Sequence, residues 1–434
     1  MDALPPERGS IAQETGPARR VRRAGVRQYA EHRERRDGPV SEASEPCSAP
    51  VDRGGGGARR YGVALIALLA LITLFYTYFG YPLLIGVLAR IAPQKVHEDP
   101  DYLPSVTACI PVFNAASYLK AKVESLLALD YPADKLEILL YSDGSTDDTN
   151  AAAEALAARD PRIKLIKAEE RKGKPTAVNV MRAAATGEVL LMTDVRQPLV
   201  PGALRALVRK LVDPKVGCVS GNLVLEGSAG SGAYWRYENW IRRMEARFRG
   251  MVGVTGPIYA IRKADMAPLP MGIILDDMWV PMRLRLAGRN ILFAEDAIAH
   301  DDAFGDEREF GRKVRTLAGN YQLFGLLPAL LVPLRNPSWF ETFSHKILRL
   351  VGPWALIGLL VSSTIASFEP PEVSHLVRTA MRVLAAGQAA FYLLALVGPK
   401  GGKVGTIART FVVMNVAALV GLWRVLRGAQ KVTW

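Results

Sequence analysis

The chain has 434 residues, half of them hydrophobic, and a net charge of +13 at pH 7. This length has room for two or three domains, because one domain usually takes about 100–200 residues. Three scattered cysteines exclude a disulfide framework and a zinc site built on paired cysteines. The basic balance favours an anionic partner, such as a membrane surface or a nucleotide phosphate.

The first 60 residues mix arginines with acidic residues, prolines and a run of four glycines, and they show no apolar periodicity. This composition predicts a disordered tail over residues 1–60. Nucleic-acid binding is the alternative use of the arginines, but acidic residues are interleaved with them and no aromatic platform accompanies them. Residues 61–89 contain no charged residue and predict a transmembrane helix, since about 20 apolar residues cross a bilayer.

Further apolar segments follow residue 321. Residues 322–346 include an uncharged run broken by Pro328 and Pro333, which is too short to span and predicts an interfacial or re-entrant segment. Residues 347–426 predict about three transmembrane helices, from the apolar runs 350–368, 383–397 and 411–423, and residues 427–434 form a tail. The lengths of the last two runs are marginal, and they span only if the flanking basic side chains reach the interfaces.

The charges between the apolar runs predict an orientation. Lysines and arginines gather on one side of the C-terminal runs, and two glutamates lie on the other. The positive-inside rule therefore predicts that residues 100–321 lie in the cytoplasm. With four spans the arginine-rich tail would lie outside, so either a terminal helix does not cross or the tail is translocated.

Residues 100–321 alternate apolar strands with helical patterns. Strands are expected at 106–110, 136–141, 163–166, 189–193 and 216–219. This alternation predicts an α/β fold with a mostly parallel sheet, whose function lies at the carboxyl ends of its strands. A basic aromatic segment at 234–243 predicts an amphipathic helix lying on membrane or core, with direct acceptor binding as the alternative.

Carboxylates and lysines stand at the expected loops of this domain: Asp143 and Asp194 after strands, Asp276 and Asp277 after an apolar run, and Lys172 and Lys174 before a helix. Carboxylates bind Mg²⁺ or Mn²⁺, and lysines help such a cation to neutralise a diphosphate. A further carboxylate can take a proton from a hydroxyl nucleophile. Each aspartate alone is more often a turn or cap residue, but their joint order predicts displacement of a nucleoside diphosphate from a sugar.

Several motifs together carry a resemblance to a known family: Ile110-Pro111-Val112-Phe113-Asn114, Ser142-Asp143-Gly144-Ser145-Thr146-Asp147, Lys172-Gly173-Lys174 with Asn179, Thr193-Asp194, Gly256-Pro257-Ile258-Tyr259-Ala260-Ile261-Arg262, and Asp276-Asp277. In their order and spacing, residues 106–321 resemble a membrane-integrated family 2 glycosyltransferase, of the group that contains cellulose, hyaluronan and poly-N-acetylglucosamine synthases. The resemblance implies a Rossmann-like GT-A domain, α/β with a mostly parallel sheet, between flanking transmembrane helices. It also implies an integral protein of the bacterial inner membrane whose catalytic domain is cytoplasmic.

The resemblance implies a role for each matching position. Asp277 would be the general base for the acceptor hydroxyl, and Asp194 would bind the diphosphate through Mg²⁺ or Mn²⁺. The other donor-side residues would be Pro111, Phe113, Asn114, Asp143, Lys172, Lys174, Arg312 and Arg315. The acceptor-side residues would be Gly256, Tyr259, Arg262 and Asp276. The implied partners are a UDP-sugar donor, a glycan or lipid-linked acceptor, membrane lipid, no nucleic acid, and an accessory or export subunit.

The sequence departs from the family pattern in three places. Ser142 stands where an aspartate is usual, and Arg196 replaces the second aspartate of the Asp-x-Asp motif, which removes a metal ligand and adds a cation. The segment at 312–316 lacks the tryptophan of the acceptor-clamping motif of processive synthases, so long-chain processivity is in doubt. Arg312 and Arg315 keep their charges for the diphosphate, with the solvated face of a helix as their alternative.

Two readings of function from different classes therefore remain open. The first is an inverting glycosyltransferase that makes or extends a polysaccharide or glycolipid. The second is a catalytically silent subunit that binds nucleotide-sugar or partners during assembly or export, and Arg196 is its main support. A pure transporter fits poorly, because the apolar runs contain no buried charge that could form a pathway.

Overall fold

The computed structural model describes residues 56–226, 231–302, 306–369 and 373–430. The predicted tail at 1–60 lies almost wholly outside these residues, as do the last four residues of the predicted tail at 427–434. The first described helix, α1 (Gly56–Phe75), begins before the boundary expected at residue 61.

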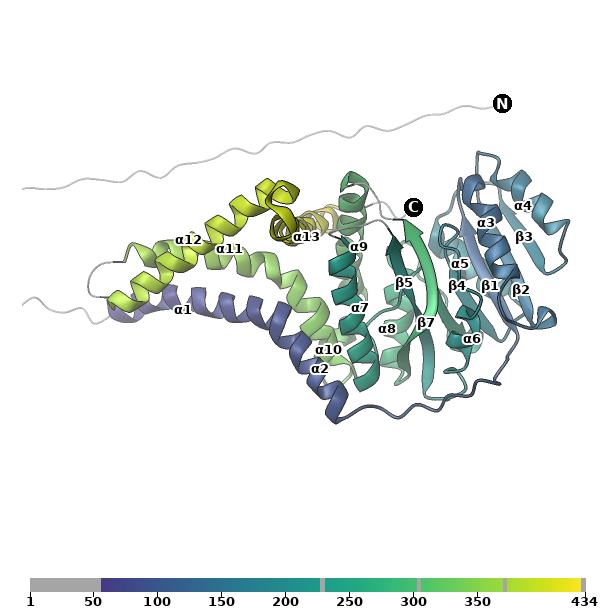
Figure 1. The fold of residues 1–434 in the computed structure, drawn as a ribbon, viewed down its shortest axis with the longest axis horizontal. Coiled ribbons are helices and arrows are strands. Elements are labelled where there is room, and N and C mark those ends of the chain that lie inside the picture. The colour runs from purple at the N-terminus through teal and green to yellow at the C-terminus, as the bar shows by residue number, and fades with distance from the viewer. Residues whose placement is uncertain (1–55, 227–230, 303–305, 370–372, 431–434) are drawn as a thin grey trace, which may run out of the picture. The chain divides into compact units, whose positions relative to one another are not determined.

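A seven-stranded sheet with the order β3-β2-β1-β4-β6-β5-β7 forms the centre of the domain (Figure 1). Its strands are β1 (Val106–Val112), β2 (Leu136–Asp143), β3 (Ile163–Ala168), β4 (Val189–Thr193), β5 (Val216–Glu226), β6 (Ile258–Arg262) and β7 (Asn290–Asp302). All pairs except those of β6 are parallel. The expected α/β fold with a mostly parallel sheet is therefore confirmed.

The central strands are mostly apolar, which suits a sheet that helices cover on both faces. Every residue of β1 is buried, and alternate side chains join two separate cores. Ile110 packs with Leu119 and Val123 of α3 (Ala116–Leu127), whereas Cys109 packs with Val178 of α5 (Lys174–Ala184). Burial on both faces is typical of parallel sheets and explains why these strands read as continuous apolar runs.

The remaining helices of the domain complete its two layers. The face of α3 also carries α4 (Thr149–Ala157) and α6 (Ala203–Val208), and the face of α5 carries α8 (Asp276–Leu286) and the end of α9 (Asp306–Leu326). Because β1, β2 and β4 run parallel, their carboxyl ends meet at one edge of the sheet. β6 is antiparallel to β4, so Ile258 at its start lies beside Thr193.

Three stretches of the described chain are long and apolar enough to cross a membrane: Tyr61–Ile91, Trp339–Ser367 and His375–Leu426. The first comprises most of α1, then η1 (Tyr76–Gly80) and α2 (Tyr81–Ile91), and the second comprises α10 (Trp339–Glu341), η5 (Thr342–Ile347) and α11 (Leu348–Ser367). The third contains α12 (His375–Val397) and α13 (Gly402–Leu426), joined by η6 (Gly398–Gly401).

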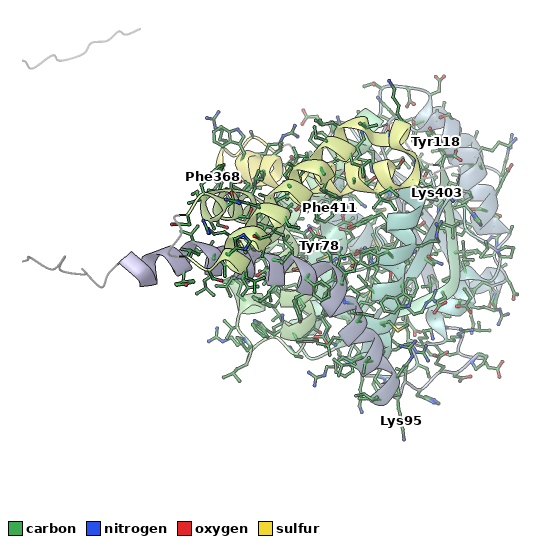
Figure 2. The ribbon with its side chains drawn as sticks, turned by 60° about the vertical axis from the view of Figure 1, so that its left-hand side comes forward. Tyr78, Lys95, Tyr118, Phe368, Lys403 and Phe411 are labelled. Atoms are coloured by element: carbon green, nitrogen blue, oxygen red, sulfur yellow. The ribbon has the colours of Figure 1, made fainter. Side chains whose placement is uncertain are left out.

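The apolar helices pack against one another through aromatic and small residues. Tyr78 of η1 meets Phe411 of α13 edge to face, with ring centroids 4.8 Å apart (Figure 2). Ala67 and Leu74 of α1 pack with Leu359 of α11. Figure 1 shows α1 running alongside α11, and α13 reaching α9 of the domain.

A polar cluster that is buried from solvent joins these helices to the domain. The basic aromatic segment forms part of α7 (Ser231–Phe248), which packs on α2 through Ile241 and Met244. Glu238 and Glu245 of α7 hold the ring of His345 from η5, at 3.0 Å to Nε2 and 2.7 Å to Nδ1. These contacts favour the prediction that the segment lies on core over the alternative of direct acceptor binding.

Candidate active site

The loop after β1 and the loop after β2 are tied together at the carboxyl edge of the sheet. Asn114, with a φ of 47°, accepts a hydrogen bond from the backbone N–H of Thr146 at 2.8 Å. Ser142, where an aspartate was expected, donates to Ser145 at 2.9 Å. The guanidinium of Arg171 lies 3.6 Å from the ring centroid of Phe113, so an aromatic platform already stacked by a cation borders this loop.

Asp143, the last residue of β2, is fully buried and holds the loop before α5. Its two carboxylate oxygens accept hydrogen bonds from the backbone N–H groups of Lys172 and Gly173, both at 2.8 Å. Gly173 has a φ of 86°, which a residue with a side chain rarely adopts. Asp143 therefore fixes the turn that places Lys174 at the start of α5.

Lys174 connects two of the predicted carboxylates. Its Nζ lies 3.0 Å from Asp194 Oδ1 and 3.4 Å from Asp276 Oδ2. Burial opposes the charge of this lysine, but the carboxylates of Asp194, Asp276 and Asp277 outweigh it and raise its pKa. Burial likewise opposes the charge of Asp194, and Lys174, Lys122 and Arg312 outweigh it and hold the pKa of Asp194 below its usual value. Both groups are therefore ionised at neutral pH.

Asp277 lies in the first turn of α8, next to Asp276. Burial, and secondly the neighbouring carboxylate of Asp276, raise the pKa of Asp277 to about 6. Val254 donates its backbone N–H to the carbonyl oxygen of Asp277 at 3.1 Å, and a Cβ on Gly256 would come within 3.0 Å of the carboxylate. Within the described chain Asp277 Oδ1 is buried and makes no hydrogen bond, so it can accept one from a ligand.

The structure places the predicted acceptor-side residues at two different edges of the sheet. Gly256 lies against Asp277, and the buried hydroxyl of Tyr259 is near enough to Asp276 and Asp277 for their charges to raise the pKa of Tyr259. Burial is the largest cause of that shift. Arg262 instead pairs with Val189 at the amino end of β4 and bonds the carbonyl oxygen of Asp213 at 2.9 Å. Because β6 is antiparallel, its last residue lies at the opposite edge of the sheet, and Arg262 is not part of the site.

α9 brings its two predicted arginines to different parts of the site. Burial lowers the pKa of Arg312. The nearby carboxylates of Asp301 and Asp194 favour the charged form and offset part of this effect. Arg315 points one Nη toward the carbonyl oxygen of Ile274 at 3.4 Å, in the run before Asp276. Arg312 is therefore close to the candidate diphosphate site, and Arg315 lies against the segment that carries the candidate base.

Three further residues near these groups were not among the candidates from sequence. Lys122 of α3 is fully buried and donates to Thr193 Oγ1 at 2.6 Å and to the carbonyl oxygen of Gln197 at 2.5 Å, and burial lowers its pKa to about 7. Gln322 of α9 accepts a hydrogen bond from the backbone N–H of Ile274 and donates one to the carbonyl oxygen of Gly272, both in the run before Asp276. Asp301 of β7 pairs with Arg196. Of these three residues, Lys122 alone gave a signal in the sequence, as a lysine on the apolar face of an expected helix.

A divalent cation fits this site only with help from a ligand. In the part of the chain that the structure describes, no group of three or more His, Cys, Asp or Glu side chains could hold a metal ion by itself. Asp194 offers one carboxylate at the sheet edge. Mg²⁺ is commonly bound by one or two carboxylates together with substrate phosphates, so Asp194 and a diphosphate would form an adequate set of donors.

The sheet topology, with carboxylates and cations at the carboxyl edge of its parallel strands, is that of a GT-A domain. The family model for glycosyl transferase family 2 matches residues 107–265. An N-acetylglucosaminyltransferase of Bradyrhizobium elkanii is 30% identical over 143 residues, which cover 32% of this chain and 74% of that protein. The chain belongs to glycosyltransferase family 2.

Two further similarities extend the comparison. An N-acetylglucosaminyltransferase of Rhizobium meliloti (strain 1021) is 28% identical over 188 residues, 41% of this chain. The chain spans only 43% of the length of that relative. The mannosyltransferase PcManGT from Pyrobaculum calidifontis, solved with GDP-Man and Mn²⁺, has a TM-score of 0.67 and 25% identity, over 85% of this chain and 100% of that one. The similarity to PcManGT extends beyond the GT-A domain, since it covers most of the chain.

Proposed function

We propose that this chain is an inverting glycosyltransferase of the membrane, which moves a sugar from a nucleotide-sugar to a hydroxyl of a glycan or lipid-linked acceptor. The observation that carries the proposal is the Asp277 carboxylate, which is buried and has a pKa near 6 and an oxygen available for a hydrogen bond. It lies in one site with the Asp194–Lys174 ion pair. A base with a pKa slightly below neutrality is suited to accept a proton at neutral pH.

The donor is bound, on this proposal, across the carboxyl ends of β1, β2 and β4. The Asn114 loop and Phe113 border the nucleoside, and Asp143 keeps the Lys172–Gly173 turn in place. Lys174 and Arg312 lie beside Asp194 and neutralise charge on the diphosphate. A divalent cation bound at Asp194 supplies further neutralisation of the leaving diphosphate.

The acceptor hydroxyl is activated, on the same proposal, by Asp277. Its free Oδ1 accepts the hydroxyl proton while the oxygen attacks the anomeric carbon from the side opposite the diphosphate. One direct displacement inverts the anomeric configuration. Holding the two reactants together supplies a large part of the rate, because the reaction becomes effectively unimolecular.

The membrane helices support an acceptor site at the bilayer surface. α12 and α13 have 23 and 25 residues, and each is long enough to cross separately, which gives four crossings with α1–α2 and α11. Leu331 and Leu334, within the broken apolar segment, are exposed and suit an interfacial position. The cytoplasmic orientation expected from the loop charges, and an accessory or export subunit, belong to the same proposal.

The decisive test is release of nucleoside diphosphate by the full chain in detergent, with Mg²⁺ or Mn²⁺. UDP-N-acetylglucosamine comes first, because the relatives named above are N-acetylglucosaminyltransferases, and GDP-mannose follows because PcManGT was solved with it. We expect one donor to be turned over, EDTA to abolish turnover, and Asp277→Asn to remove it with nucleotide binding intact. The exposed Asp134→Asn is the matched control and keeps full turnover.

Two results would contradict the proposal. Turnover that persists in Asp277→Asn would exclude this residue as the base. Nucleotide binding without turnover of any donor, in the presence of metal and of membrane extract as a source of acceptor, would support the silent subunit instead.

A further inference from the structure

Arg196 occupies the position, two residues after Asp194, where the family pattern has a second metal-binding carboxylate. Its guanidinium makes an ion pair with Asp301 Oδ1, and the neighbouring Gln197 donates from Nε2 to Asp301 Oδ2 at 2.8 Å. Asp301 is only 5% exposed, near the end of β7. Both oxygens of this carboxylate are thus engaged by two consecutive residues of the Asp194 loop.

The surroundings of this pair are rich in positive charge. The charges of Arg196 and Asp301 both act on Arg312, which in turn acts on Asp194. Lys174 contacts Asp194 directly at 3.0 Å. Lys174, Lys122 and Arg312 therefore all act on the carboxylate of Asp194, and Arg196 adds a fourth cation beside Arg312. This arrangement is better suited to an anionic ligand than to a metal ion alone.

A guanidinium suits a diphosphate because its planar fork can donate to two phosphate oxygens at once. Asp301 and Gln197 fix Arg196 and its loop before any ligand arrives, which reduces the ordering cost of binding. The Arg196 side chain is about a quarter exposed, so a ligand can reach part of it while the ion pair with Asp301 is kept.

We propose that Arg196, held in position by Asp301, binds the diphosphate of the nucleotide directly and replaces a second metal-binding carboxylate. The inference rests on the proposed function and deepens it: the diphosphate charge is shared between Arg196 and a metal ion that has Asp194 as its one protein carboxylate. Asp301 is a positioning residue, acting through Arg196. It follows that the protein retains nucleotide affinity when metal is removed.

The experiment measures UDP and GDP binding to the full chain in detergent by calorimetry, once with Mn²⁺ and once with EDTA. We expect wild-type affinity for the preferred nucleotide to fall by no more than about tenfold in EDTA. Arg196→Gln then weakens binding in EDTA by about 10- to 100-fold, the size of a charge-assisted hydrogen bond. Arg196→Lys, which keeps the charge but loses the fork, gives an intermediate value. The exposed Arg159→Gln is the matched control and binds as wild type.

Three further variants separate a binding role of Arg196 from a purely structural one. Asp301→Asn weakens binding in EDTA less than Arg196→Gln, and the double variant is no weaker than Arg196→Gln alone, because Asp301 acts only through Arg196. Arg196→Asp creates the two-carboxylate motif, and we expect Mn²⁺ affinity, measured by electron paramagnetic resonance without nucleotide, to rise while UDP binding in EDTA is lost.

The outcomes divide as follows. Arg196→Gln and Arg196→Lys could lower the unfolding temperature and yet leave the metal-free dissociation constant within about twofold of wild type, a change under 1 kcal/mol. In that case Arg196 has only a structural role and the inference is wrong. Complete loss of wild-type binding in EDTA also overturns it, while the proposed function stands. Absence of UDP and GDP binding even with Mn²⁺ overturns the proposed function itself.

Discussion

Gly319 of α9 lies directly against Leu275, the residue before Asp276. A Cβ at position 319 would come within 2.3 Å of Leu275 Cγ and within 3.2 Å of Ile274 Cγ2. The absence of a side chain on α9 therefore makes room for the segment that leads into the first turn of α8. α9 is packed in turn on α13, where a Cβ on Gly421 would meet the amide nitrogen of Ala318 at 2.9 Å.

Gly319→Ala should disturb the candidate base without touching the nucleotide site. The added methyl group pushes Leu275 aside, and we expect kcat to fall by about 10- to 100-fold, as for a base displaced by about 1 Å. The cost to stability should be about 1–3 kcal/mol, typical of overpacking. Gly325→Ala on the same helix meets nothing within 4 Å and should keep full activity. Equal effects of the two variants on kcat would contradict this account.

The pKa of Asp277 predicts an acidic limit to activity. Because burial and Asp276 raise that pKa to about 6, the carboxylate is protonated below this pH and cannot accept a proton. We expect kcat/KM to fall by about tenfold for each pH unit below pH 6. Between pH 6 and neutrality, kcat/KM should change little. Removing the like charge with Asp276→Asn should move the limit to lower pH. A limit that stays in place would show that another group controls it.

Asp143→Ala should loosen the turn before α5. The change leaves the backbone N–H groups of Lys172 and Gly173 without their acceptor, which should cost about 1–3 kcal/mol of unfolding free energy. It should also weaken nucleotide binding, because Lys174 is no longer held beside Asp194. Thermal unfolding and calorimetric UDP titration measure the two effects. Asp134→Ala, at an exposed position, serves as control, and an Asp143→Ala protein with wild-type stability would refute the structural role.

His345→Ala should unfold the joint between the membrane helices and the domain. It removes the ring that joins the buried carboxylates of Glu238 and Glu245. Glu238 keeps its pair with Arg349 and Glu245 keeps the hydroxyl of Tyr81, so we expect the cost of a lost buried hydrogen bond, about 1–3 kcal/mol for each carboxylate. We expect a lower unfolding temperature in detergent and less folded protein after extraction. His375→Ala, exposed at the start of α12, should change neither. An unaltered unfolding temperature in His345→Ala would be the contrary result.

Much of the fold can be predicted from sequence because the strands on one side of the sheet are apolar on both faces. β1, β2 and β4 read as short, mostly apolar runs, and the aspartates at the end of β2 and directly after β4 mark their carboxyl ends. β6 and β7 escaped prediction. β6 is antiparallel, and the β5–β7 ladder is irregular, with a register shift after Ser220, while the charged Glu295 and Asp296 interrupt the apolar pattern of β7.

The sequence predicts the site residues that directly follow a strand or an apolar run. It does not predict contacts between residues from distant segments. Asp194, Lys174 and Asp276 were expected and lie together. Arg262 was misplaced because its motif does not reveal that β6 runs backwards, which puts the end of the motif at the far edge. The Arg196–Asp301 pair joins residues 105 positions apart, and only the closing of β7 onto β5 brings them into contact.

The ring of His345 binds one glutamate on each side, and Tyr81 donates to the same oxygen of Glu245 at 2.6 Å. One residue of this junction comes from α2, two from α7 and one from η5. Neither the first nor the second apolar stretch can therefore be replaced alone by that of a relative. A gene fragment limited to residues 100–321 would encode carboxylates whose partners are missing. Recombination between relatives would then preserve function only where all three segments are inherited together.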